Sequence, residues 1–145
     1  MDMQPVNGYI HPDRTWMPED KVTLSLDMPT VMMRANPRVY EDIGRVAVMR
    51  GPLVYCPEEA DNGKGLHRFH LDEKSDFEIK WQPELLNGIV TIESNGVRET
   101  DEGWKKGSLY AEETDMATEP VRLRWISYYA WAIRGVGEMR VWVQK

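Results

Sequence analysis

The stretch Arg45-Val-Ala-Val-Met-Arg-Gly-Pro-Leu-Val-Tyr-Cys56 holds two short apolar runs separated by Gly51-Pro52. In the first run the positions from Val46 to Met49 are apolar on both faces of an extended chain. Such a pattern is typical of a strand that is covered on both sides. Glycine followed by proline breaks the run, and Leu53 to Cys56 then resume extended structure. The stretch therefore predicts two consecutive strands in a β protein.

Similar runs recur along the rest of the chain, and apolar and polar residues alternate in most of them, as in half-buried strands. Asn87-Gly88 and Asn95-Gly96 lie beside such runs and are hairpin signals. No stretch keeps helical spacing over three turns. We therefore predict an all-β, antiparallel β-sandwich of jelly-roll type with little or no helix. Besides the two strands above, strands are predicted over residues 21–27, 31–35, 66–71, 77–81, 89–93, 108–110, 121–125 and 139–143.

The composition is that of a globular chain, with 145 residues, 41% hydrophobic residues and a net charge of −6. Nucleic acids and anionic membranes are bound by basic surfaces, so neither is an expected partner. No stretch of the sequence is long and apolar enough to predict a transmembrane segment, and we expect no signal peptide. The single cysteine excludes an internal disulfide and a cysteine-based metal cluster.

No group of residues forms a recognisable catalytic or metal-binding motif. His67 and His70 are three residues apart, and a strand would turn them to opposite faces; with His11, we expect them to be surface histidines. The carboxylate pairs Glu58-Glu59 and Glu112-Glu113 stand in polar stretches, where solvated side chains are expected. We therefore predict no catalytic, cofactor-binding or metal-binding residue.

Cys56 is expected to be a structural residue. It follows two apolar residues in a predicted strand, where a free cysteine behaves as a small hydrophobe. A reactive cysteine needs a base or positive surroundings to form its thiolate. Glu58 and Glu59 follow it instead.

Four aromatic residues, Trp125, Tyr128, Tyr129 and Trp131, crowd into seven positions near the end of the chain. On a strand, Tyr129 and Trp131 share one face and Tyr128 lies on the other. Buried, these side chains would belong to the core or to a domain interface, and we favour that interpretation. Exposed, they would form a platform on which sugar rings can stack.

Two motifs give the chain a family resemblance. Arg45 to Cys56 and Tyr128-Tyr-Ala-Trp-Ala-Ile-Arg-Gly-Val-Gly-Glu-Met-Arg-Val-Trp142 resemble the C-terminal part of glycoside hydrolase family 127, which contains bacterial β-L-arabinofuranosidases. The stretch before them resembles the same family at Gly8-Tyr-Ile10, Arg14-Thr-Trp16, Asp20 and Met28-Pro29. Residues 72–118 contribute little to the resemblance.

The resemblance implies that the chain is not the catalytic part of such an enzyme. The family's nucleophilic cysteine, acidic partner and zinc-binding cysteines lie in an (α/α) barrel, and none has a counterpart here. Cys56 should not inherit the nucleophile's role. The family's corresponding region forms β-sandwiches after the barrel. Residues 1–60 would then be the end of a middle sandwich and residues 61–145 the C-terminal one, with both able to pack as one unit.

The function implied is that of a non-catalytic accessory region that supports the barrel and forms a domain or subunit interface. The alternative is a carbohydrate-binding module that uses the aromatic residues. Strands that precede Gly8 in the family are absent, so the chain looks like a fragment or a separately expressed tail. An open sheet edge would result, and such edges recruit other strands. We therefore expect a homodimer or strand exchange; the alternative is that the N-terminal residues fold back and cap the edge within one monomer. The sequence does not identify the compartment; we expect a soluble protein of the bacterial cytoplasm or periplasm, without a cofactor.

Overall fold

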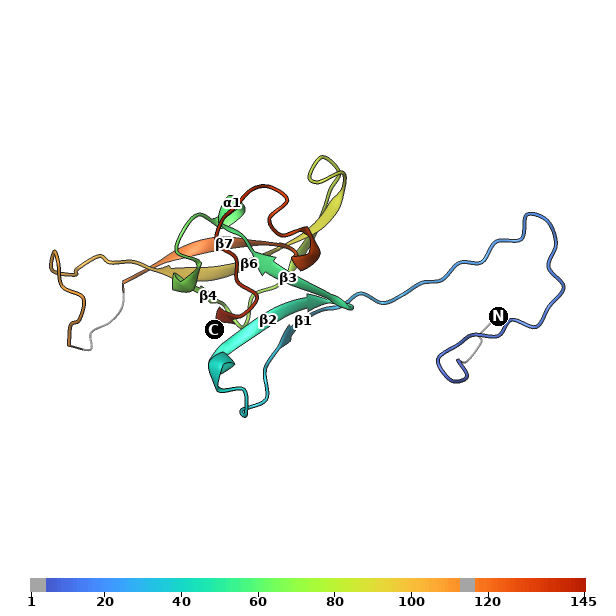
Figure 1. The fold of residues 1–145 in the computed structure, drawn as a ribbon, viewed down its shortest axis with the longest axis horizontal. Coiled ribbons are helices and arrows are strands. Elements are labelled where there is room, and N and C mark those ends of the chain that lie inside the picture. The colour runs from blue at the N-terminus through green and yellow to red at the C-terminus, as the bar shows by residue number, and fades with distance from the viewer. Residues whose placement is uncertain (1–4, 113–116) are drawn as a thin grey trace.

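The computed structural model of the chain describes residues 5–112 and 117–145. A β-sheet body occupies the centre of Figure 1, and two long irregular segments leave it on opposite sides. One is the N-terminal arm, residues 5–29; the other is the loop between β6 and β7. The strands are β1 (Thr30–Met33), β2 (Arg45–Arg50), β3 (Leu53–Pro57), β4 (Phe69–Leu71), β5 (Glu78–Gln82), β6 (Ile89–Glu99), β7 (Thr118–Ser127) and β8 (Val143–Gln144).

Helical structure is limited to single turns. These are α1 (Glu59–Asn62) and the 3₁₀ turns η1 (Tyr40–Asp42), η2 (Leu66–Arg68) and η3 (Tyr128–Ala130). The prediction of an all-β chain with little helix is therefore confirmed. None of the helices within the described ranges is long and apolar enough to cross a membrane.

The strand pairings close on themselves. The order is β1-β2-β3-β7-β6-β4-β8, and β8 also pairs with β2. Six strands thus form a ring, with β1 added beside β2 and β5 beside β6. The β4–β8 pair is parallel and the other pairs are antiparallel, so the sheet is mixed where an antiparallel one was expected. The described residues form one continuous sheet, and two separate sandwich layers are not seen.

The core lies inside the ring. It holds Val46, Val48, Tyr55, Leu66, Phe69, Leu71, Ile92, Leu123, Trp125 and Val143. A smaller cluster of Cys56, Ile89, Ile126 and Ala130 lies on the other face of the sheet. The covering of both strand faces that was expected for β2 is observed, because Val46 and Val48 are buried on one face and Ala47 on the other. β3 likewise contributes Tyr55 to the first cluster and Cys56 to the second.

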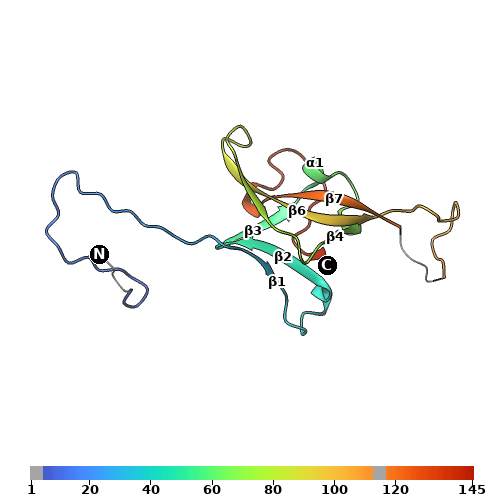
Figure 2. The same cartoon turned by 180° about the vertical axis from the view of Figure 1, so that it is seen from behind.

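Several local predictions are wrong. Residues 21–27 form no strand, because no other described strand lies beside them; they run through the arm (Figure 2). Asn95-Gly96 makes no hairpin, since β6 continues through it. Residues 108–110 stay in a loop, and the strand expected over 139–143 is reduced to β8.

Strands on both sides of the expected domain boundary share the sheet. β3 ends at Pro57 and pairs with β7, which begins at Thr118. In the described parts of the chain, the regions before and after residue 60 therefore contribute strands to one sheet.

Candidate functional site

The aromatic residues after β7 divide between the core and the surface. Trp125 is fully buried, and its indole N–H donates a hydrogen bond of 2.9 Å to Ser94 Oγ. Tyr128, Tyr129 and Trp131 are 46, 68 and 40% exposed. Of the four predicted contact residues, only the last three are therefore accessible to a ligand or partner.

The three exposed aromatics do not lie on a strand as expected, because the chain turns through η3 after Ser127. The turn brings the rings of Tyr128 and Trp131 together, with centroids 6.3 Å apart and planes 16° from parallel. Tyr129 stands apart from this pair. The result is a short aromatic stack in place of a flat row.

The loop that follows Trp131 is fixed by the buried carboxylate of Glu58. Its Oε1 accepts a 3.0 Å hydrogen bond from the backbone N–H of Ala132, and its Oε2 lies 2.5 Å from Arg134 Nη2. Ala132 has φ +66°, a left-handed conformation that is uncommon for residues other than glycine. The backbone bond to Glu58 holds this conformation. Glu58 is thus buried and paired, and not solvated as its sequence context suggested.

Arg134 joins a second carboxylate to the first. Its guanidinium donates two bonds to Asp61, with Nη1–Oδ1 at 3.0 Å and Nη2–Oδ2 at 2.5 Å. These bonds, followed by those to Glu58, raise the pKa of Arg134 above its already high usual range. A two-pronged pairing of this kind fixes orientation as well as charge. Arg134 therefore ties the C-terminal loop to α1.

Glu59 and Glu138 make the other side of this junction. Glu59 Oε2 accepts a 3.0 Å bond from the backbone N–H of Glu138. Glu138 in turn accepts bonds from the N–H groups of Gly65 and Leu66, at 3.0 and 2.9 Å. These backbone donors lower the pKa of Glu138, so it is ionised at neutral pH.

Between α1 and this loop lies a pocket of about 270 Å³, which we call the loop pocket. Its lining combines an indole, charged groups of both signs and a stretch of backbone rich in glycine. The lining residues are Glu58, Glu59, Ala60, Trp131, Arg134, Gly135, Val136, Gly137 and Glu138.

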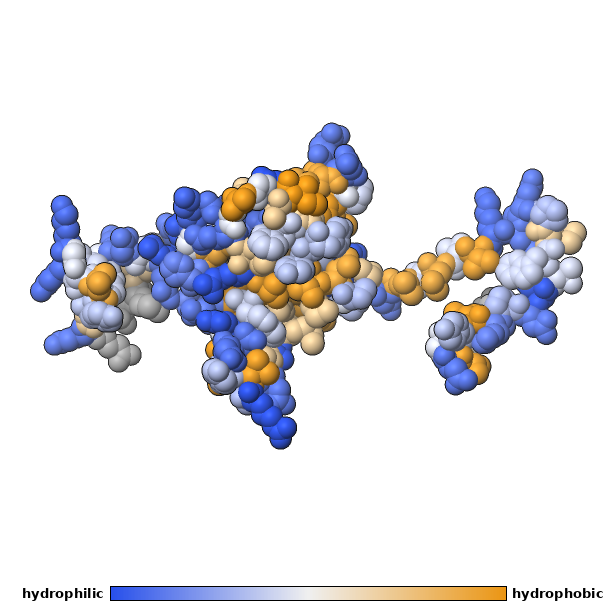
Figure 3. Space-filling view, viewed as in Figure 1, coloured by the Kyte–Doolittle hydropathy of each residue, from blue (hydrophilic) through white to orange (hydrophobic). Residues whose placement is uncertain are grey.

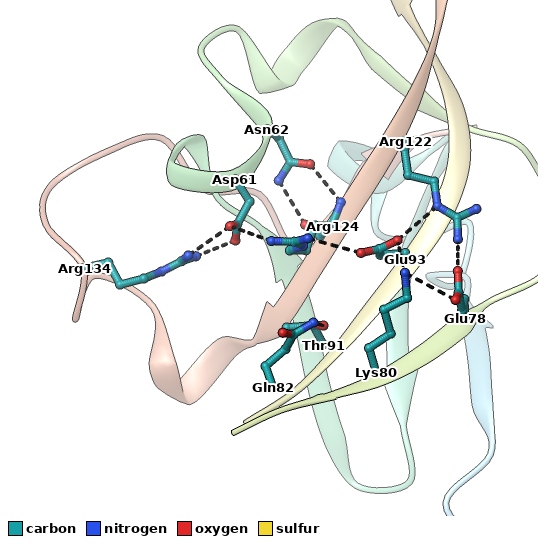
Figure 4. A network of polar contacts seen from close by, with 10 residues as sticks. All are labelled: Asp61, Asn62, Glu78, Lys80, Gln82, Thr91, Glu93, Arg122, Arg124 and Arg134. Carbon is teal, nitrogen blue, oxygen red and sulfur yellow. Dashed lines mark hydrogen bonds and ion pairs between the residues drawn. The ribbon is translucent and has the colours of Figure 1, made fainter. Parts of the chain in front are cut away.

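A network of charges covers the outer face of β5, β6 and β7 (Figure 4). At its centre the carboxylate of Glu93 lies 2.8 Å from Lys80 Nζ and 3.3 Å from both Arg122 Nε and Arg124 Nη2. The bond from Lys80 is the main cause of a lowered pKa at Glu93, which the two arginines lower further. Arg124 also lies 3.7 Å from Asp61, which links this network to the loop pocket.

The remaining candidate groups lie apart from one another. Cys56 is fully buried, and burial, reinforced by Glu58, raises the pKa of its thiol to about 12. His11 and His67 are exposed, and His70 is paired with Glu99. Among the residues that the structure describes, no group of three or more His, Cys, Asp or Glu side chains is placed to hold a metal ion. Glu112 is exposed and Glu113 lies outside the described residues.

The family comparison identifies the body of the fold. The model of the glycoside hydrolase family 127 C-terminal domain matches residues 30–144, from the first residue of β1 to the last of β8. The chain belongs to glycoside hydrolase family 127. This confirms the resemblance that the two sequence motifs indicated.

Related family 127 proteins match the chain along most of its length. A non-reducing end β-L-arabinofuranosidase from Bifidobacterium longum subsp. longum is 42% identical over 130 residues, which are 86% of this chain and 20% of that protein. The crystal structure of a GH127 β-L-arabinofuranosidase from Geobacillus stearothermophilus T6 superposes with a TM-score of 0.76 at 41% identity, covering 81% of this chain and 18% of that one. Another GH127 β-arabinofuranosidase gives a TM-score of 0.68 at 40% identity, covering 81 and 17%.

The chain therefore spans about a fifth of the length of these relatives, and the family 127 domain it forms is the C-terminal one. The sequence match is longer than residues 30–144 alone, so it includes part of the arm. Sequence patterns did not single out Arg134, Asp61 or Glu93, because these residues come together only through contacts between distant segments.

Proposed function

We propose that this chain is a non-catalytic accessory domain of a family 127 enzyme and that its arm supports the catalytic (α/α) barrel by docking against it. The arm carries the observation on which the proposal rests. Val22, Leu24 and Leu26 alternate along it, as on one face of a strand, and are 75, 66 and 68% exposed. Figure 3 shows hydrophobic residues along this segment next to the body. An apolar stripe of this kind is typical of a protein contact.

The state of the buried ionisable groups supports the non-catalytic part of the proposal. A glycosidase needs one carboxylic acid with a raised pKa and a second carboxylate across the sugar. Here Glu58 is paired with Arg134 and Glu93 with three cations, while Cys56 keeps its proton. Two relatives are β-L-arabinofuranosidases, and we propose that the enzyme to which the domain belongs acts on β-L-arabinofuranosides. We expect the chain alone to release no product from aryl β-L-arabinofuranosides; turnover abolished by mutating one of its carboxylates would contradict this.

Thermal unfolding tests the docking. The catalytic region of a family 127 arabinofuranosidase, produced without its own C-terminal domain, should unfold at a higher temperature when this chain is added, because binding stabilises the folded state. Leu24→Lys should abolish the increase. Thr23→Lys, which adds the same charge on the opposite face of the arm, should preserve it. An equal loss with both variants, or no increase with the unchanged chain, would contradict docking through the apolar stripe.

A second function, carbohydrate binding, is favoured by the exposure of Tyr128, Tyr129 and Trp131. Aromatic faces stack on the apolar faces of sugars. Co-sedimentation with insoluble arabinose-containing polysaccharides tests it: the chain should pellet with them, and Tyr128→Ala should reduce the pelleted fraction. A chain that remains in the supernatant would contradict this function and leave the docking proposal intact.

A further inference from the structure

We propose that the loop pocket binds a single neutral sugar ring, with Trp131 as the stacking surface and Glu59 and Glu138 as acceptors for the sugar's hydroxyl groups. The inference rests on the second proposed function and adds the place, the size and the chemistry of the ligand.

The size of the pocket restricts the ligand. Pockets for drug-sized ligands typically measure about 300–1,000 Å³, and the loop pocket, at about 270 Å³, lies below this range. One sugar ring suits such a volume better than a longer glycan chain. A terminal residue of a glycan can enter while the rest of the glycan remains outside.

The pocket offers the two surfaces that a sugar ring requires. Trp131 lines it and is 40% exposed, so part of the indole is available to the C–H face of a sugar. The carboxylates of Glu59 and Glu138 also line it. Each carboxylate has about four acceptor sites, and the backbone bonds to Glu59 and Glu138 leave some of these for hydroxyl donors.

The lining carries charged groups of both signs. Arg134 lines the pocket among the carboxylates, and its guanidinium can donate hydrogen bonds that the carboxylates cannot. Glu58 is already neutralised by Arg134. Hydroxyl groups both donate and accept hydrogen bonds, which suits a lining of mixed sign.

The pocket is held in a fixed shape before any ligand binds. The loop's backbone is bonded to Glu58 at Ala132 and to Glu59 at Glu138, and Arg134 is bonded to Asp61. A site whose groups are already in place loses less conformational freedom on binding. The ion pairs that fix the loop therefore contribute to ligand binding without touching the ligand.

NMR titration of the 145-residue chain with L-arabinose tests the proposal, with D-xylose and D-galactose for comparison. Saturable amide shifts should concentrate at Ala60, Gly135 and Gly137. Trp131→Ala should weaken binding on the order of tenfold, and Glu59→Gln, which keeps the shape of the side chain, should weaken it severalfold. Trp104→Ala is the matched aromatic control, because Trp104 is 48% exposed but does not line the pocket, and it should bind as the unchanged chain does.

Three results would overturn the proposal. They are the absence of saturable shifts with all three sugars, binding that survives both pocket variants, and tighter binding of arginine amide than of any sugar. Circular dichroism of each variant checks that the fold is retained. If polysaccharide still pellets the chain while the pocket variants have no effect, the carbohydrate-binding function survives and the assignment of the pocket fails.

Discussion

Cys56 shows how burial controls chemistry at a single residue. The side chain is fully buried, and burial raises the pKa of its thiol from 9.0 to about 12. Since the thiolate is the reactive form, the folded chain should react with a disulfide reagent at pH 8 much more slowly than the unfolded chain in denaturant. Equal labelling rates in the two states would contradict this. Because the unfolded thiol ionises first, its contribution also makes the folded state less stable as the pH rises above about 9.

Arg134 is the residue on which the C-terminal loop depends. Its removal would leave Glu58 and Asp61 as buried carboxylates without their main partner. Breaking such a pair costs on the order of 3 kcal/mol, so Arg134→Met should lower the urea midpoint of unfolding clearly. Arg38→Met is the control, since Arg38 is exposed and forms no ion pair among the described residues. Equal midpoints for the two variants would mean that Arg134 has no structural role.

Among the strands, Glu93 holds β6 to its neighbours on both sides. Lys80 comes from β5, and Arg122 and Arg124 come from β7. The partners are partly exposed, so we expect Glu93→Gln to lower the free energy of unfolding by only about 1–2 kcal/mol at pH 7. Glu84→Gln, at an exposed position, should have no effect.

The stabilisation that the ionised Glu93 carboxylate provides depends on pH in a defined direction. Its folded pKa lies below the ordinary value of 4.5. The stabilisation is therefore complete above pH 4.5 and is lost as the pH falls through the lower folded value. Urea unfolding at several pH values should show that the difference in free energy of unfolding between the unchanged chain and Glu93→Gln becomes smaller below pH 4.5. A constant difference would contradict the assignment to an ionised carboxylate.

Gly96 marks the closest approach between two strands. A Cβ at this position would collide with the carbonyl oxygen of His70 on β4 and lie 3.1 Å from Leu123 Cδ1. Gly96→Ala should therefore destabilise the chain by about 1–3 kcal/mol, measured by urea unfolding. In Gly137→Ala the new Cβ contacts only the side chain of Glu59, at 3.2 Å or more. Gly137→Ala should therefore destabilise the chain less than Gly96→Ala. A larger effect at Gly137 would contradict this account.

The strands show what the local sequence could and could not predict. Alternation predicted the strand around Leu123, and apolar runs separated by Gly51-Pro52 predicted those around Val46 and Tyr55, because these patterns depend only on neighbouring residues. Asn95-Gly96 was wrongly predicted to be a hairpin turn, because glycine also occurs where two backbones come close together. At Gly96 the close backbone belongs to β4, a distant segment of the chain. Val22 to Leu26 alternate like a strand, yet a strand also requires a partner to pair with.

For the candidate site, the sequence drew attention to Trp131, which lines the loop pocket, but not to the contacts that build the pocket. The aromatic cluster drew attention to Tyr128 and Trp131, which are exposed, and to Trp125, which is buried. The turn η3 separates them, and no local pattern predicted it. The carboxylates Glu58 and Asp61 stand more than 70 residues from Arg134, so their pairing depends on the closed sheet.

At the scale of the whole molecule, the open edges and the arm together favour self-association. Among the described strands, β1 and β5 each pair on one side only, and unpaired edges accept strands from other chains. In the absence of the catalytic region, we expect a homodimer in which the apolar stripe of the arm is covered by the second copy. Light scattering should give twice the 16.9 kDa monomer mass as concentration rises, and Leu24→Lys should return the mass to that of a monomer. A monomer mass up to high concentration would contradict the dimer.

The closure of the sheet by β8 has a consequence for synthesis. β2 pairs with β8 at Arg45–Gln144 and Val46–Val143, so the ring needs a strand that follows all the others in the chain. At translation rates of about 5–20 residues per second, β2 leaves the ribosome about 5–20 seconds before this partner exists. During that interval its apolar residues lack their final cover. Chaperone binding to the nascent chain should therefore persist until β8 emerges.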